Sequence, residues 1–162
     1  MNIRKTTFAD LNSLLEIYAT AREFMAKNGN PNQWGSAWPP QEQIKEDIRQ
    51  GYSYVCECEG QIAGTFFFNA GKDIEPTYRL ITEGKWGNDT PYGVIHRLAS
   101  NGKAKGIGAF CIQWCYEQCG HLRVDTHPDN RPMQHLLHKL GFAYRGIIHV
   151  KHDPMPRLAF EK

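Results

Sequence analysis

Three glycines and two lysines gather within residues 102–108, between an apolar segment at 94–100 and an apolar helical repeat that begins after Gly106. The first-turn amides of a helix have no intrahelical partner, and the helix dipole places partial positive charge there. Glycine allows a ligand to approach the backbone closely, and the lysines add positive charge. This combination predicts a binding site for a phosphate or a pyrophosphate.

The spacing separates this stretch from two common phosphate motifs. A P-loop has its lysine after the last glycine and then Ser or Thr, whereas Lys105 precedes Gly106 here. A dinucleotide fingerprint needs a third glycine, which Gly106-Ile107-Gly108 lacks. What remains is a basic residue, two further residues, and then Gly-x-Gly, which starts at Lys103. Taken alone, an ordinary glycine-rich loop with solvated lysines explains it equally well.

A second pattern lies downstream. Asn130 opens a loop, a helix with Pro132 in its first turn follows, and Gly141 ends that helix before the next strand. The two patterns together resemble those of the GNAT superfamily of N-acetyltransferases, which has Gln or Arg where this chain has Lys103. The second family motif is commonly N-x-x-A-x-x-L-Y-x-K-x-G-F, and the residues that match it are Asn130, Leu136, Lys139, Gly141 and Phe142.

The resemblance implies that acetyl-CoA is the co-substrate and that backbone amides of 103–109 hold its pyrophosphate. The backbone around 98–100 would pair with the pantetheine arm as an added strand does. Asn130 would bond that arm, or it would only be a residue of the helix-entry turn. The complete expected set of cofactor-binding residues is Leu98, Ala99, Ser100, Lys103, Ala104, Lys105, Gly106, Ile107, Gly108, Ala109, Asn130 and Leu137.

His96 and Tyr144 are the catalytic candidates. Acetyl transfer needs an unprotonated amine, and a histidine on the signature strand has a suitable pKa for a general base. His96-Arg97-Leu98-Ala99 also resembles the setting of a strand histidine in family members that act on arylalkylamines. A purely structural histidine is the alternative. The usual tyrosine acid of the family is Leu137 here, so Tyr144, Tyr116, a water or no dedicated acid takes its place.

The expected acceptor is a primary amine of a small molecule or a peptide. Trp34, Trp38 and Trp86 lie in loops and would bind the acceptor if they reach the cleft, or else they cover the edge of the sheet. Segment 70–92 is expected to form a second wall of the cleft, and its carboxylates either attract a cationic amine or are simply solvated. A non-catalytic acyl-CoA sensor is the alternative function, because Leu137 replaces the acid.

Hydrophobic periodicity predicts the elements that position these residues. A strand, a helix and a second strand in succession around the glycine loop imply two parallel strands. The resemblance implies an α/β (α+β) fold: a mixed, mostly antiparallel sheet of about 6–7 strands with a splayed central parallel pair and about 4 helices, in one domain over 1–162. The expected strands are 2–6, 52–58, 61–69, 94–100, 122–126, 142–150 and 157–161, and the expected helices are 7–27, 41–49, 106–118 and the segment before Gly141.

The composition narrows the partners. The 162 residues carry a net charge of +2, and the basic residues are scattered, so no nucleic-acid partner is expected. No apolar run is long enough for a membrane span and no signal peptide is apparent, so a cytoplasmic protein without a membrane partner is expected. The five cysteines favour reduced thiols, without a metal site. A homodimer stays open.

Overall fold

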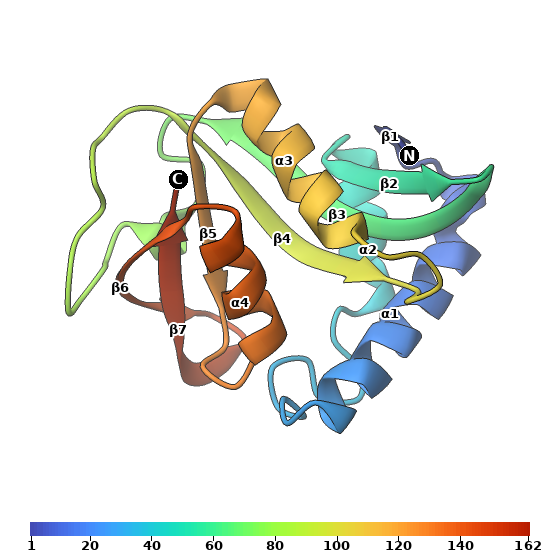
Figure 1. The fold of residues 1–162 in the computed structure, drawn as a ribbon, viewed down its shortest axis with the longest axis horizontal. Coiled ribbons are helices and arrows are strands. Elements are labelled where there is room, and N and C mark those ends of the chain that lie inside the picture. The colour runs from blue at the N-terminus through green and yellow to red at the C-terminus, as the bar shows by residue number, and fades with distance from the viewer.

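The computed structural model describes residues 1–162, which form a seven-stranded sheet in the order β1-β2-β3-β4-β5-β7-β6 (Figure 1). Every neighbouring pair is antiparallel except β4 and β5, which are parallel. This confirms the predicted fold class. The strands are β1 Asn2–Lys5, β2 Ser53–Cys58, β3 Gln61–Gly71, β4 Tyr92–Ser100, β5 Leu122–Thr126, β6 Ala143–Val150 and β7 Asp153–Glu161; the helices are α1 Leu11–Lys27, α2 Gln41–Arg49, α3 Ile107–Cys119 and α4 Arg131–Lys139, with 3₁₀ helices η1 Phe8–Asp10 and η2 Pro76–Tyr78.

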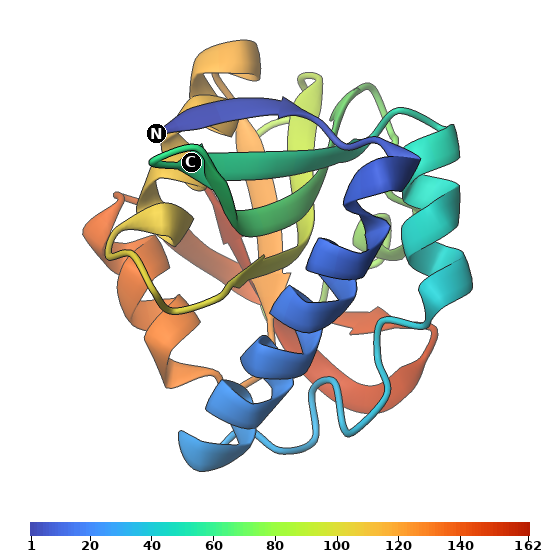
Figure 2. The ribbon, with the colours of Figure 1, turned by 90° about the vertical axis from the view of Figure 1, so that its right-hand side faces the viewer.

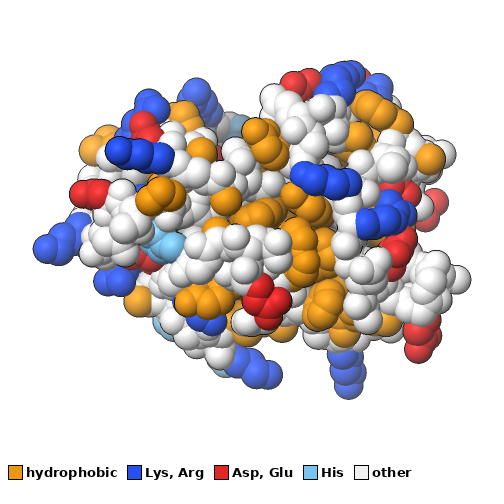
Figure 3. All heavy atoms as spheres, turned by 90° about the horizontal axis from the view of Figure 1, so that it is seen from above, with side chains coloured by type: hydrophobic (Ala, Val, Ile, Leu, Met, Phe, Trp, Pro, Cys, Tyr) orange, Lys and Arg blue, Asp and Glu red, His pale blue; other side chains and the backbone are white.

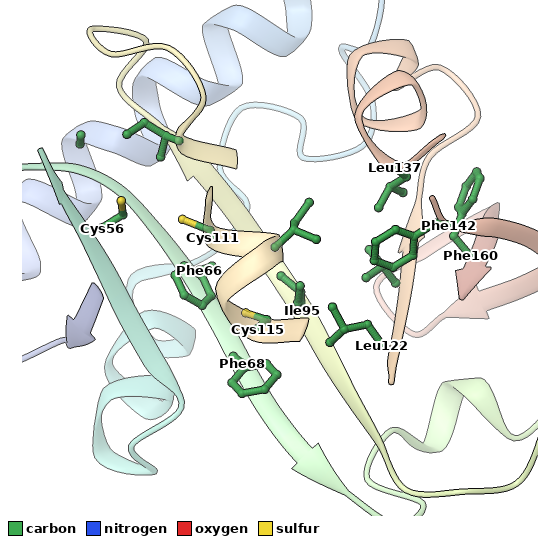
Figure 4. Packing of buried hydrophobic residues seen from close by; sticks show 14 residues of the cluster. Cys56, Phe66, Phe68, Ile95, Cys111, Cys115, Leu122, Leu137, Phe142 and Phe160 are labelled. Atoms are coloured by element: carbon green, nitrogen blue, oxygen red, sulfur yellow. The ribbon is translucent and has the colours of Figure 1, made fainter. Parts of the chain in front are cut away.

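Helices cover both faces of the sheet. Figure 2 shows α1 and α2 on one side and α3 and α4 on the other. The alternation of side chains along β2 places Val55 in the core under α1 and α2 and its neighbour Cys56 in the core under α3. Figure 4 shows that second core, in which Cys111 and Cys115 of α3 lie near Phe66. The sheet is therefore buried on both faces.

The parallel pair separates soon after it begins. Only Gly93 with Leu122 and Val94 with Arg123 are in register, and no residue of β4 after Val94 pairs with β5. A bulge adds one residue to β4 near Arg97, whose φ of +54° is in the left-handed region. Bulges bend a strand and increase its twist, so β4 turns away from β5 (Figure 1). The predicted splayed pair is thus confirmed.

Most element boundaries agree with the predictions to within one or two residues. Glu59 and Gly60 form the predicted hairpin turn, and both have positive φ, as type I′ turns require. The prediction for the last strand was too short, because β7 begins at Asp153 and forms a hairpin with β6. Segment 70–92 contains η2 and one isolated bridge, from Thr82 to Ile147.

The surface carries charged side chains of both signs (Figure 3). On the face seen in Figure 3, Lys and Arg side chains are scattered, Asp and Glu side chains lie among them, and hydrophobic side chains are exposed between them. None of the helices has both the length and the apolar character needed to cross a membrane. All five cysteines are free thiols.

Candidate active site

A pocket of about 400 Å³ lies where β4 and β5 diverge. β4 contributes residues 95–98 to its lining and β5 contributes 124–126. Further walls come from the loop around Trp34 and Trp38, the segment 75–77 and residues 150–152, together with Gln43, Met133 and Arg157. The gap between the strands therefore continues into an open pocket instead of being filled by core side chains.

The pocket joins the two faces of the sheet. Ile95 and Val124 belong to the core under α3 and α4. Their neighbours His96 and Asp125 must point to the opposite face, because successive side chains alternate along a strand. Consistent with this, the His96 ring lies 5.6 Å from that of Phe67, which packs against the third core on that face. Two ligands could therefore meet in the gap, each entering from its own side.

His96 lies at the centre of a polar network. Its Nε2 is 2.8 Å from Oε2 of Glu75, and the other oxygen of Glu75 accepts hydrogen bonds from the backbone N–H and the hydroxyl of Thr77. On the other side of the ring, Nδ1 is 3.9 Å from Oδ1 of Asp125. That oxygen accepts a 2.6 Å hydrogen bond from the hydroxyl of Tyr78.

The charge of Glu75 determines which ring nitrogen of a neutral His96 carries the proton. Burial favours a raised pKa for Glu75, but hydrogen bonds and charge from His96, helped by Thr77, lower that pKa to about 2. Burial first, and then the charge of Asp125, raises the pKa of Tyr78 well above its usual value, so the phenol remains a neutral donor. An ionised Glu75 can only accept a hydrogen bond. A neutral His96 therefore carries its proton on Nε2, and Nδ1 remains free to accept one.

Arg97 holds the bulge that presents this ring. Its guanidinium donates two hydrogen bonds, of 2.9 and 3.0 Å, to the carboxylate of Asp47 in α2. It also lies 4.8 Å from the centre of the Phe67 ring. A non-glycine residue at positive φ is strained and persists only when its surroundings hold it. The ion pair therefore connects the shape of β4 to α2.

Two of the three predicted tryptophans reach the pocket. Trp34 lines it and packs edge-on against Tyr18 at 5.7 Å. Trp38 lines it and stacks on His152, with ring centres 4.0 Å apart and planes 9° apart. Trp86 does not line the pocket, because its ring packs on Tyr78 and its Nε1 donates to the Tyr78 carbonyl at 2.8 Å. Trp86 instead supports η2.

The glycine loop leaves room for an anion. Gly102 and Gly106 both have positive φ, and a Cβ added to either would meet no atom within 4 Å. The first hydrogen bond of α3 runs from the N–H of Phe110 to the carbonyl of Gly106. The N–H groups of 107–109 therefore have no hydrogen-bond partner within the helix. The backbone and open space in this loop fit the pyrophosphate of acetyl-CoA.

The other expected cofactor contacts lie around this loop. Lys103 and Lys105 are exposed on it and Ala104 is partly exposed, whereas the Ile107 side chain is buried in the core. On the adjoining strand, Ala99 and Ser100 pair with β3, and no strand pairs with the other edge of 95–100. That edge faces the gap and fits an extended ligand such as a pantetheine arm.

Asn130, Leu137 and Tyr144 are absent from the pocket lining. Asn130 is the N-cap of α4: its Oδ1 accepts from the N–H of Met133 at 3.2 Å, and its Nδ2 donates to the pocket-lining residue Gln33 at 2.9 Å. The contact with Met133 is that of a helix-entry residue, and a contact with the pantetheine arm stays a prediction. Leu137 has no exposed surface and packs in the core near Phe142 and Phe160 (Figure 4). Tyr144 is 46% exposed on β6, outside the pocket lining.

Sequence reasoning missed the partners of His96. Glu75 was considered only as one of several loop carboxylates, and neither Asp125 nor Tyr78 was singled out. One signal was available: alternation in 122–126 places Arg123 and Asp125 on the same face of a strand expected in the middle of the sheet. Charged residues are rarely buried unless they are paired, so this pattern could have indicated a functional role for that face.

Comparisons with known proteins give a consistent assignment. The model of the Acetyltransferase (GNAT) family matches residues 11–142. A GNAT acetyltransferase from Streptococcus agalactiae 2603 is 30% identical, with 99% of this chain and 94% of that chain covered and a TM-score of 0.88. A search of curated protein sequences gives no match.

Two more distant structures share the fold. The protein yncA from Salmonella typhimurium, solved with its cofactor acetyl-CoA, is 18% identical over 99% of this chain and 92% of its own, with a TM-score of 0.63. The ribosomal-protein-alanine N-acetyltransferase from Brucella melitensis is 21% identical over 100% and 99%, with a TM-score of 0.62. The chain is thus a member of the GNAT family of acetyltransferases, whose co-substrate is acetyl-CoA.

Proposed function

We propose that this protein transfers the acetyl group of acetyl-CoA directly to a primary amine of a small molecule or a peptide. The observation that carries the proposal is the position of His96, in the pocket where β4 and β5 diverge, with Nε2 bonded to Glu75 and Nδ1 free. A general base is needed because an alkylamine is mostly protonated at neutral pH and its ammonium form has no lone pair for attack.

The co-substrate side of the site is the face of α3 and α4. The amides of 107–109 and the charges of Lys103 and Lys105 would bind the pyrophosphate, and the free edge of β4 at 98–100 would hold the pantetheine arm. Bound acetyl-CoA supplies an acetyl group activated as a thioester. Backbone N–H groups on the free edge of β4 are the donors available to the thioester carbonyl oxygen.

The acceptor side is the opposite face. Trp34, Trp38 and His152 wall the pocket there, which keeps bulk water away from the amine while His96 takes its proton. Neither Leu137 nor Tyr144 reaches the pocket, so we propose that the thiolate leaves without a dedicated side-chain acid. A pocket of about 400 Å³ accommodates a small amine or the terminal residue of a peptide. By its name, the Brucella melitensis neighbour N-acetylates alanine of a ribosomal protein.

The test is thiol release from acetyl-CoA over a panel of primary amines, with the acetylated product identified by mass spectrometry. His96→Ala should lower kcat by about 10²–10⁴-fold, which is the usual contribution of a general base. His135→Ala is the matched control, because His135 is exposed on α4 outside the pocket. Equal activity of the two variants would exclude His96 as the base.

The second candidate is an acyl-CoA sensor without catalysis. It is favoured by one observation: the residue that replaces the family's tyrosine acid, Leu137, is completely buried. A sensor would be stabilised by acetyl-CoA in a thermal unfolding assay and yet release no thiol with any amine. A protein that is neither stabilised nor active would contradict both candidates.

A further inference from the structure

Two carboxylates lie within 4 Å of the His96 ring, and only one of them has hydrogen-bond partners on both of its oxygens. Both oxygens of Glu75 accept hydrogen bonds, from His96 on one side and from Thr77 on the other. Asp125 accepts a single side-chain hydrogen bond, from the Tyr78 hydroxyl to Oδ1. Its Oδ2 has no partner and is not buried, and Asp125 lines the pocket. Asp125 therefore presents a free carboxylate oxygen to whatever occupies the pocket.

The two arginines that line the pocket are paired with other carboxylates, whereas Lys151, which also lines it, has no ion-pair partner. Arg97 pairs with Asp47, and Arg157 pairs with Asp153 at 2.8 Å. The Asp125 side chain is only 10% exposed, and its one cationic neighbour within 4 Å is His96, which is charged only when protonated. A carboxylate removed from water is costly unless a positive charge or hydrogen-bond donors compensate it. The free oxygen of Asp125 is therefore suited to a cation with N–H donors that enters through the pocket.

We infer that Asp125 anchors the acceptor as an alkylammonium ion, held between Oδ2 and Nδ1 of His96, and that Glu75 is a positioning residue that keeps the proton of His96 on Nε2. The inference rests on the proposed function and names its substrate class: amines that are cationic in water, in preference to arylamines that are neutral. Tyr78 orients the Asp125 carboxylate through its hydrogen bond to Oδ1.

The proton transfers balance. One N–H bond of the ammonium breaks as an Nδ1–H bond forms on His96, and the resulting imidazolium lies between the carboxylates of Glu75 and Asp125. The freed lone pair forms the N–C bond to the acetyl carbon, and the C–S electron pair departs with sulfur. The second proton of the acceptor nitrogen neutralises the thiolate. His96 then returns its proton to solvent, so each turnover releases one proton.

A binding experiment tests the anchor without requiring turnover. Benzylamine is a cation at pH 7.5 and benzyl alcohol is its neutral counterpart of similar shape. Isothermal titration into the complex with coenzyme A should show benzylamine binding at least about 10-fold more tightly, as expected for a charge-assisted contact in a buried site. In Asp125→Asn, which keeps an acceptor for Tyr78, this ratio should fall towards one.

The matched control is Asp73→Asn. Asp73 is a carboxylate of segment 70–92, but it is 55% exposed, paired with Arg79 and outside the pocket. The ratio of the affinities for benzylamine and benzyl alcohol in Asp73→Asn should equal that of the wild type. A wild-type protein without a preference for benzylamine, or a preference that survives in Asp125→Asn, overturns the anchor. A preference that depends on Asp125 without thiol release from any amine would refute the proposed transferase and leave the anchor standing.

The positioning role of Glu75 has its own readouts. The groups that face His96 from the surrounding elements are Glu75, Tyr78, Asp125 and Asp47. Ring ¹⁵N NMR of the wild type with a neutral His96 ring should show Nε2 protonated. The opposite tautomer overturns the assignment without any mutation.

Glu75→Gln keeps a hydrogen-bonding oxygen but no longer restricts this side chain to accepting hydrogen bonds. Its amide N–H can donate to Nε2, so the ring ¹⁵N spectrum of this variant should show both tautomers. An unchanged tautomer in this variant would mean that Glu75 has only a structural role.

Discussion

The protonation pattern of His96 is determined by side chains outside its own strand. A solvated imidazole exchanges its proton between both nitrogens, whereas Glu75 accepts from Nε2 and leaves Nδ1 towards the pocket. Glu75 lies 21 positions before His96 in the chain. A histidine on a strand therefore became a candidate base only through a loop carboxylate that packs over the sheet.

Leu137 illustrates the reverse case, in which a motif position is a core residue. Leu137→Ala should lower the free energy of unfolding by about 2–5 kcal/mol, because Leu137 is fully buried and a cavity would remain. Urea denaturation measures this. Leu80→Ala is the control, since Leu80 is 74% exposed and the change should stay within about 0.5 kcal/mol. If Leu137→Ala weakened acetyl-CoA binding by the still-folded protein without loss of stability, a cofactor contact would be the better interpretation.

Sequence reasoning reached His96 but not its partners, and the reason is physical. The loop motif and the helix after Asn130 are local patterns, so they could be found in sequence. The contacts of His96 with Glu75 and Asp125 join segments that meet only after the sheet has formed. Trp34, Trp38 and Trp86 look alike as loop tryptophans, yet the structure brings only the first two to the pocket.

At the level of elements, the gap depends on how β4 leaves β5. The order of strand, helix and strand predicted a parallel pair, and the resemblance to the family predicted its separation. The bulge itself carried no local signal, because arginine is not a residue expected at positive φ. The strained backbone of Arg97 is stabilised by the ion pair with Asp47 of α2, which forms only in the folded structure.

The start of α1 offers a pH-dependent test at the same scale. Asp10 accepts hydrogen bonds from the backbone of Thr7 and from Arg4 at 2.8 Å, and chiefly the Arg4 contact lowers its pKa from 3.8 to about 2. A lowered pKa means that the stabilisation is present above pH 3.8 and is lost as the pH falls towards 2. Asp10→Asn should therefore cost about 1–2 kcal/mol at pH 7, after a discount for the partly exposed Arg4.

Urea unfolding of Asp10→Asn and the wild type at pH 7 and near pH 2 measures the effect, and the difference between them should shrink at the lower pH. Asp89→Asn, at an exposed position without a charged partner, should match the wild type at both. A difference that stays constant with pH would mean that the carboxylate charge of Asp10 contributes nothing, and that only the shape of the cap matters.

On the scale of the whole molecule, the sheet consists of two parts joined by a short seam. β1–β4 and β5–β7 meet through two residue pairs, while every other neighbouring strand pair has at least four. Side-chain contacts bridge the parts on the acceptor face, among them Tyr78 to Asp125 and Trp38 to His152. A ligand in the gap would add contacts to both parts at once.

This arrangement predicts where acetyl-CoA should slow hydrogen exchange. Acetyl-CoA at a hundredfold excess over its Kd should raise the unfolding free energy by about 2.7 kcal/mol, because it binds only the folded chain. Exchange should slow most at the amides of 95–100 and 107–109, and also in β5 across the gap, because the ligand holds both edges. The hairpin of β2 and β3 is the internal control and should gain only the global stabilisation. ADP, which lacks the pantetheine arm, should protect 107–109 and leave 95–100 unchanged. Protection confined to the hairpin, or equal protection by ADP at both segments, would contradict a thioester arm lying between β4 and β5.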